Sequence, residues 1–158
     1  DTVCPVAGKK PDMMFIDAGG GADLVDRLHE LTDPSGKPYE KRVKAISFAA
    51  TPFDPTKYTN KRNEMWQEMA AWITDEHVDV EIPDTDSIQA DLCASLYRRD
   101  SQDRIVLLSK DQIKAELGYS PDEGDALALT WSEPIIVKKQ DFEDKMRRSH
   151  GPQSWMMG

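Results

Sequence analysis

The sequence predicts an α/β domain, because short apolar runs alternate with segments whose apolar residues recur at helical spacing. Residues 13–16 are apolar and end in Asp17 and three glycines, a pattern typical of a buried strand followed by a tight turn. Residues 22–31 then have helical spacing, and residues 43–49 alternate like a second strand. A strand, a helix and a strand in such close succession predict a right-handed crossover between two parallel strands.

The rest of the chain predicts further elements of both kinds. Helices are expected over residues 60–73, 85–97, 110–117 and 120–130, and strands over residues 78–82, 104–108 and 134–138. Met65, Trp66 and Met69 form the expected inner face of the first of these helices. Gly118 should end the third, and Ser120 should cap the fourth with a proline at its first position. Residues 1–150 are expected to form one domain, and residues 151–158 a mobile tail.

Composition limits the classes of function. The chain has 158 residues, which is enough for one domain with a real core. Its net charge of -9 argues against a protein that binds DNA chiefly by neutralising phosphates, although acids that converge on metal ions can still act on DNA. Two cysteines are too few for a disulfide framework or a cysteine-rich zinc site, and no apolar run is long enough to cross a membrane.

Asp17 is the first candidate for chemistry. It stands at the carboxyl end of a predicted parallel strand, where open α/β sheets place their ligands. The glycines that follow it permit a sharp turn and the close approach of a ligand. The alternative is that Asp17 only caps the following helix, and the sequence leaves both possibilities open.

Asp122 and Asp125 are the second candidate. They are three residues apart, so on a helix they share one face about one turn apart. Compensation of the helix dipole explains Asp122 well. It explains Asp125 less well, because apolar neighbours predict that this carboxylate is partly buried, where it needs a metal ion or a hydrogen-bond donor.

If both sites reach the same end of the sheet, their acids form a carboxylate cluster with no histidine or cysteine. Such hard oxygen ligands suit Mg²⁺ or Mn²⁺. These ions hydrolyse phosphodiesters in pairs, roughly 3.5–4 Å apart, by activating water and stabilising the leaving oxygen. Under that condition, Asp17, Asp122 and Asp125 would be candidate ligands of such a metal site.

Three motifs follow one another along the chain. The first is an aliphatic strand that ends in Asp17 and three glycines, with Val-Asp-Arg-Leu after it at 25–28. The second comprises Tyr58, Asn60, Arg62 and Trp66, and the third is Ser-Pro-Asp-Glu-Gly-Asp-Ala-Leu at 120–127. In this order and spacing they resemble the nuclease domain of the large terminase subunit of tailed bacteriophages. The resemblance covers roughly residues 11–131, and its last motif is the most specific.

The resemblance implies an RNase H-like fold, a mixed sheet flanked by helices, and a DNA endonuclease that cuts concatemeric viral DNA during genome packaging. It makes Asp17 and Asp125 catalytic metal ligands, with Asp122 as a near neighbour and Mg²⁺ or Mn²⁺ as cofactor. Lys110 matches a recurrent basic position and is a candidate phosphate contact, although a solvated lysine at a helix start is an equal alternative. Lys61 and Arg62 are the other candidate DNA-binding residues.

The resemblance also implies partners and a place of action. The substrate would be double-stranded viral DNA, and the terminase small subunit and portal protein would be reached through the full-length protein, with no membrane partner. The setting would be the cytoplasm of a bacterium that carries the phage or prophage.

The chain departs from the family's pattern ahead of Asp17. The family places another essential acid on the first strand of its sheet, and no counterpart is evident here. Asp12 would lie about 16 Å from Asp17 along one strand, and Asp1 precedes no apolar run. The phosphate-binding motif of the packaging ATPase is also absent from this sequence. The chain is therefore expected to be a fragment without the first strands, and weakly active or inactive alone.

Two other classes of function remain open. Asp17, Gly19 and Gly21 after an aliphatic strand also resemble the cofactor loop of S-adenosylmethionine-dependent methyltransferases, but Asp23 replaces the third glycine of that pattern and residues 120–127 stay unexplained. A nicotinamide-binding loop fits less well. The other class is a non-catalytic DNA-docking module that lacks a complete set of acids.

Overall fold

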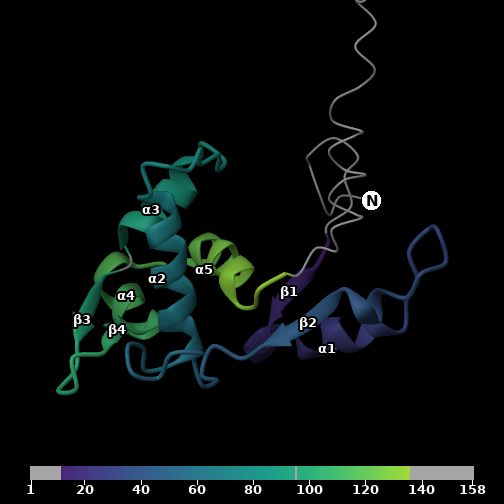
Figure 1. Cartoon of the computed structure of the whole chain (residues 1–158), viewed down its shortest axis with the longest axis horizontal. Coiled ribbons are helices and arrows are strands. Elements are labelled where there is room, and N and C mark those ends of the chain that lie inside the picture. Colours follow the sequence, from purple (N-terminus) through teal and green to yellow (C-terminus); the bar gives the residue numbers. More distant parts are fainter. Residues whose placement is uncertain (1–11, 95, 136–158) are drawn as a thin grey trace, which may run out of the picture.

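A strand, a helix and a strand open the described part of the chain. The computed structural model describes residues 12–94 and 96–135. Its first elements are β1 (Met14–Asp17), α1 (Ala18–His29), the 3-10 turn η1 (Tyr39–Lys41) and β2 (Val43–Ile46). The two strands pair in parallel, with Met14 opposite Val43 and Asp17 opposite Ile46 (Figure 1). The predicted parallel pair and its crossover helix are confirmed.

The glycines after Asp17 lie inside α1 and not in a turn. The helix begins at Ala18, four residues before the predicted start, and Asp17 is its N-cap. The prediction of a tight glycine turn is wrong because the Asp17 side chain satisfies a backbone donor of the first helical turn and so starts the helix early. Among these three glycines, Gly21 has the least room for a side chain, since a Cβ there would lie 2.4 Å from Ile16 Cγ2, whereas Gly20 faces open space.

A second group of elements lies beside this unit. It comprises α2 (Lys61–Ile73), α3 (Asp86–Ala94), β3 (Tyr97–Arg99), β4 (Ile105–Leu107), α4 (Lys110–Leu117), α5 (Asp122–Ala128) and the 3-10 turn η2 (Leu129–Trp131). Figure 1 shows α2 in the middle of this group, with the β3–β4 hairpin and α4 at one end and α3 at the other. None of the described helices is long and apolar enough to cross a membrane.

The predicted single mixed sheet is wrong for the described residues, whose strands form two separate pairs. β1 and β2 are parallel, and β3 and β4 are antiparallel. Residues 78–82 form no strand: they alternate as a strand does, but acids interrupt them, a proline follows, and no neighbouring strand pairs with them. At the edge of the β3–β4 hairpin, Ile105 of β4 forms an isolated parallel bridge with Tyr58, which lies in the loop before α2.

The boundaries of α4 follow local signals, whereas those of α3 and α5 depart from the prediction. The predicted helix 110–117 is confirmed as α4, with a Ser109–Gln112 capping box at its start and Gly118 left-handed at its end. The predicted helix 85–97 stops at Ala94, and Tyr97 enters β3. Pro121 is the N-cap of α5 and not its first helical residue. The predicted strand 134–138 falls largely outside the described residues, as does the predicted tail.

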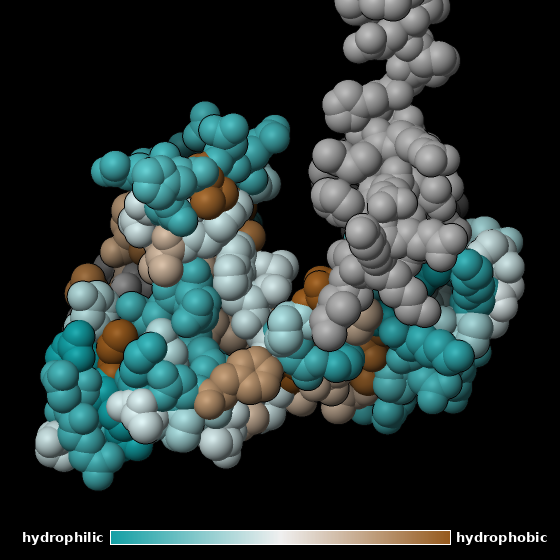
Figure 2. Space-filling model, in the orientation of Figure 1, coloured by the Kyte–Doolittle hydropathy of each residue, from teal (hydrophilic) through white to brown (hydrophobic). Residues whose placement is uncertain are grey.

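The core forms where α2, α5 and both strand pairs meet. The inner face of α2 is confirmed, since Met65, Trp66 and Met69 are all buried. The buried cluster consists of Ile46, Met65, Trp66, Met69, Leu107, Ala128 and Leu129. At the end of α2, Trp72 packs on Trp131 with ring centroids 5.1 Å apart. Outside this core the face drawn in Figure 2 is largely hydrophilic. The core fixes α5 against α2, which places the acids of α5 beside the charged first turn of α2.

Candidate active site around Asp125

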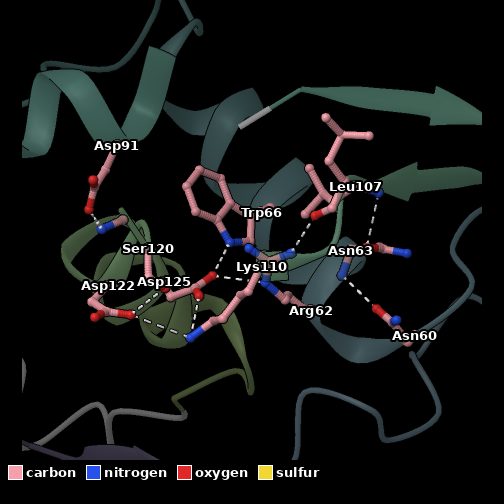
Figure 3. Close-up of polar contacts among 12 residues, drawn as sticks. Asn60, Arg62, Asn63, Trp66, Asp91, Leu107, Lys110, Ser120, Asp122 and Asp125 are labelled. Carbon is pink, nitrogen blue, oxygen red and sulfur yellow. Dashed lines mark hydrogen bonds and ion pairs between the residues drawn. The ribbon is translucent and has the colours of Figure 1, made fainter. Parts of the chain in front are cut away.

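Asp125 is a buried carboxylate held by donors from α2. It projects from α5 and is only 3% exposed. Its Oδ1 atom accepts a hydrogen bond from Trp66 Nε1 at 2.7 Å and another from Arg62 Nε at 2.9 Å (Figure 3). The burial predicted from its apolar neighbours is therefore confirmed. The donors that such a carboxylate requires are a guanidinium and an indole, which satisfy its charge within the protein.

Lys110 joins the two acids of α5. Its Nζ lies 2.8 Å from Asp125 Oδ2 and 3.6 Å from Asp122 Oδ1. Asp122 and Asp125 thus share one face, as predicted, and on that face they share one ammonium group (Figure 3). This place between two carboxylates favours a positive charge.

The contacts of Lys110 also shift its pKa. Partial burial lowers the pKa of Lys110, but the hydrogen bond and charge of Asp125 outweigh burial, and the net pKa is raised above its usual 10.5. A raised lysine pKa means that the folded state holds the proton more tightly. The ion pair therefore stabilises the fold below about pH 10.5 and is lost as the pH rises through the raised value.

The two basic residues that begin α2 are buried and have partners inside the protein. Arg62 is 8% exposed, and in addition to Asp125 it donates from Nη1 to the Leu108 carbonyl oxygen at 3.1 Å. Lys61 is 6% exposed, pairs with Glu64 at 2.6 Å, and places its Nζ 3.5 Å from the centre of the Phe53 ring. The contact of Lys61 with Phe53 joins the start of α2 to the loop before it. The DNA contacts predicted for Lys61 and Arg62 remain predictions.

Asp91 is a site residue that sequence reasoning missed. It projects from α3, is buried, and its Oδ2 accepts hydrogen bonds from the backbone N–H groups of Glu123 and Gly124, both at 2.9 Å. It thereby caps α5, a task that the side chain of Pro121 cannot perform. No local pattern could have shown this, because the cap comes from a residue more than thirty positions earlier in the chain.

Gly124 lets α5 approach α2 closely enough for Trp66 to reach Asp125. A Cβ at this position would lie 2.7 Å from the Trp66 ring and 3.1 Å from Asp91 Cβ. We expect Gly124→Ala to lower the free energy of unfolding by about 1–3 kcal/mol, because the ring and α5 must move apart. Chemical denaturation measures this loss.

Gly20→Ala is the matched control for Gly124→Ala. Gly20 is also a helical glycine, but a Cβ there would meet nothing within 4 Å. Alanine at this position should leave stability unchanged or raise it by up to about 1 kcal/mol, because it favours the helix. Equal effects of the two substitutions would contradict the close packing of α5 on Trp66.

Asp17 lies outside the hydrogen-bonded network of Asp125. It is half-buried at the end of β1, and its Oδ1 accepts from Gly19 N at 2.9 Å, so the capping alternative raised by the sequence is confirmed. Capping uses one carboxylate oxygen and does not exclude a second role. Among residues 12–94 and 96–135, no group of three or more His, Cys, Asp or Glu is arranged to hold a metal ion. The assignment of Asp17, Asp122 and Asp125 as metal ligands stays a prediction.

The fold is similar to solved structures of one nuclease domain. Against the nuclease domain of the large terminase subunit gp2 of bacterial virus Sf6 the TM-score is 0.57 at 18% sequence identity, covering 79% of this chain and 66% of that one. A mutant of that domain with manganese gives 0.55 at 18% identity, covering 78% and 66%, and a mutant with calcium gives 0.58 at 20% identity, with the same coverage. The chain has the fold of a terminase nuclease domain.

The likeness to the terminase nuclease rests on structure, since no family model and no curated protein matches the sequence. The chain spans 66% of the length of the Sf6 domain. At the level of the fold, the resemblance found in the three sequence motifs is confirmed.

Proposed function

We propose that this chain is a metal-dependent DNA endonuclease domain of the terminase type, which cuts concatemeric viral DNA during genome packaging. The observation that carries the proposal is the buried Asp125, fixed by Arg62 and Trp66 and paired with Lys110, within the fold of a terminase nuclease. A mutant of the Sf6 domain with that fold was solved with manganese. We further propose that the fold is RNase H-like, that double-stranded DNA is the substrate, and that the small subunit and portal protein are partners of the full-length protein.

The residues of the site fit a hard divalent cation. Asp122 and Asp125 offer carboxylate oxygens, the donors that Mg²⁺ and Mn²⁺ prefer, and Asp17 would supply a third carboxylate from the end of β1. The ammonium group of Lys110 lies between the two acids of α5, a place that favours positive charge, and this supports the proposal. When bound there, the ions would activate water and stabilise the leaving oxygen.

The side chains around the acids have distinct roles in this proposal. Arg62 and Trp66 fix one oxygen of Asp125, so its other oxygen points toward Lys110. Lys110 keeps the acids from repelling each other before ions arrive, and it is positioned to contact a phosphate of the substrate. Asp122 is exposed, and among the described residues its carboxylate only accepts a hydrogen bond from Ser120 Oγ and lies 3.6 Å from Lys110 Nζ. It can therefore turn toward a ligand at little cost.

The non-catalytic alternative is a DNA-docking module. The observation that favours it is that the described residues bring together no group of three metal-binding side chains. The methyltransferase alternative loses support, because Gly19–Gly21 lie within α1 and form no cofactor loop.

Thermal unfolding with metal separates these alternatives. We expect Mn²⁺ to raise the melting temperature of the chain, because an ion bound only by the folded state adds about 2.7 kcal/mol at 100 times its dissociation constant. Asp17→Asn should abolish the increase, whereas Asp23→Asn, which removes an exposed acid from α1, should retain it. No response to Mn²⁺ supports the docking module, and a response to S-adenosylmethionine supports the methyltransferase.

A further inference from the structure

Two helices begin at one pocket beside Asp125. The pocket has a volume of about 420 Å³, and its lining includes Asn60 and Ser109, the N-caps of α2 and α4. We call it the Arg98 pocket, after the residue of β3 that lines it. The positive ends of both helix dipoles face it, which favours a negatively charged ligand.

The charge of the Arg98 pocket is opposite to that of the chain. The chain has 29 acidic and 20 basic residues. Arg62, Arg98 and Lys110 line the pocket, and no Asp or Glu is among its described lining residues. Arg62 and Lys110 pair with Asp125 beneath the lining, so Arg98 is the lining residue whose positive charge meets no acid among the described residues. Such a charge at the start of two helices is a feature expected where an anion binds.

The polar side chains at the helix starts present donors to this pocket. The side-chain oxygens of Asn60 and Gln112 accept capping hydrogen bonds from Asn63 N and Ser109 N. Their NH₂ groups are therefore the parts of these side chains that can bind a ligand. The first N–H groups of α2 bond carbonyl oxygens of the preceding loop, so α2 contributes its dipole and side chains and not its backbone donors.

The guanidinium group of Arg62 gives a second and independent sign of an anion. Its Nε bonds Asp125 and its Nη1 bonds the Leu108 carbonyl, but its Nη2 is buried and donates to none of the described residues. Arg62 is 8% exposed and lines the Arg98 pocket. A buried NH₂ group without an acceptor is costly, and an oxygen of a bound anion would supply the acceptor.

We propose that the Arg98 pocket binds a phosphodiester group of a DNA strand next to the bond that is cut at Asp125. The identity of the ligand rests on the proposed function, while the anion site rests on the helix starts, the charges and Arg62. Arg98 faces the pocket together with Val106, its partner across the hairpin. Arg99, next to it on β3, belongs to the other face and pairs with Asp103 at 3.1 Å.

Because successive side chains of β3 point to opposite faces, R98Q and R99Q are a matched pair of variants. Both residues are exposed, so neither change should disturb folding, which circular dichroism verifies. Binding of a fluorescent duplex oligonucleotide is measured by anisotropy without metal, in EDTA, at several salt concentrations. R98Q should bind about tenfold more weakly, and the slope of log affinity against log salt should fall by about one, the value for one lost phosphate contact. R99Q should stay within about twofold of wild type.

Three results would overturn the assignment. Equal losses in both variants would show a general charge effect, and unchanged binding in R98Q would remove the subsite. The third result is that R98Q weakens the binding of inorganic phosphate but leaves DNA binding unchanged. The pocket would then be a site for free phosphate and not for a DNA strand.

The outcome is separable from that of the proposed function, because binding is measured without metal. Arg98-dependent binding without Mn²⁺-dependent cutting keeps the subsite and removes the nuclease. Mn²⁺-dependent cutting by the wild-type chain, together with unchanged DNA binding by R98Q, keeps the nuclease and removes the subsite.

Discussion

Asp125→Asn should lower the free energy of unfolding by about 3–5 kcal/mol, the cost of removing one partner from a buried ion pair. The carboxylate receives Arg62 Nε and Trp66 Nε1 on one oxygen and lies 2.8 Å from Lys110 on the other. The amide of asparagine keeps one acceptor oxygen, but it leaves the buried guanidinium group of Arg62 without a negative charge beside it. Chemical denaturation measures the loss.

Asp122→Asn is the control for this loss. It removes the same charge one turn earlier in α5, but its side chain is 76% exposed and lies 3.6 Å from Lys110. We expect a change of less than about 0.5 kcal/mol, as for other exposed ion pairs. Similar losses at both positions would show that the Asp125 network does not stabilise the fold.

This expectation bears on activity measurements. The resemblance makes Asp125 a catalytic metal ligand, so Asp125→Asn is an obvious variant for a cutting assay, but the network around Asp125 makes that variant a test of stability as well. Asp17→Asn is the cleaner choice. Asparagine is a good N-cap, so the start of α1 should be preserved while a charged metal ligand is lost.

Local signals predicted the elements that carry their own caps and apolar faces. The parallel strands are short apolar runs, and Ser109 and Gly118 mark both ends of α4. The strand at residues 97–99 was missed, because the helical pattern runs on to Tyr97 and the strand depends on a partner at residues 105–107. Residues 78–82 have the alternation of a strand and no neighbour to pair with.

The site was predictable in its acids and not in their partners. Apolar neighbours within the same helix predicted that Asp125 is buried. Its donors Arg62 and Trp66 are 63 and 59 residues away along the chain, so only the packing of α5 on α2 brings them to it. The cap of α5 by Asp91 is likewise a product of tertiary structure.

The cutting of DNA by this chain should depend strongly on Asp17. Two-metal hydrolysis needs enough carboxylates to hold both ions and orient the attacking water. Since no group of three metal-binding side chains occurs among the described residues, cutting by this chain should be slow and should need protein in molar excess over DNA. Loss of the Asp17 charge should slow it further by at least about 100-fold, as when a preorganised electrostatic group is removed.

Nicking of supercoiled plasmid in Mn²⁺ tests the central claim most directly. The rate is compared among the wild-type chain, Asp17→Asn and the control Asp23→Asn, each with and without EDTA. We expect slow nicking that EDTA abolishes, that Asp17→Asn loses and that Asp23→Asn retains. Nicking that survives Asp17→Asn, or no Mn²⁺-dependent nicking by the wild-type chain even in large excess over plasmid, would contradict the account.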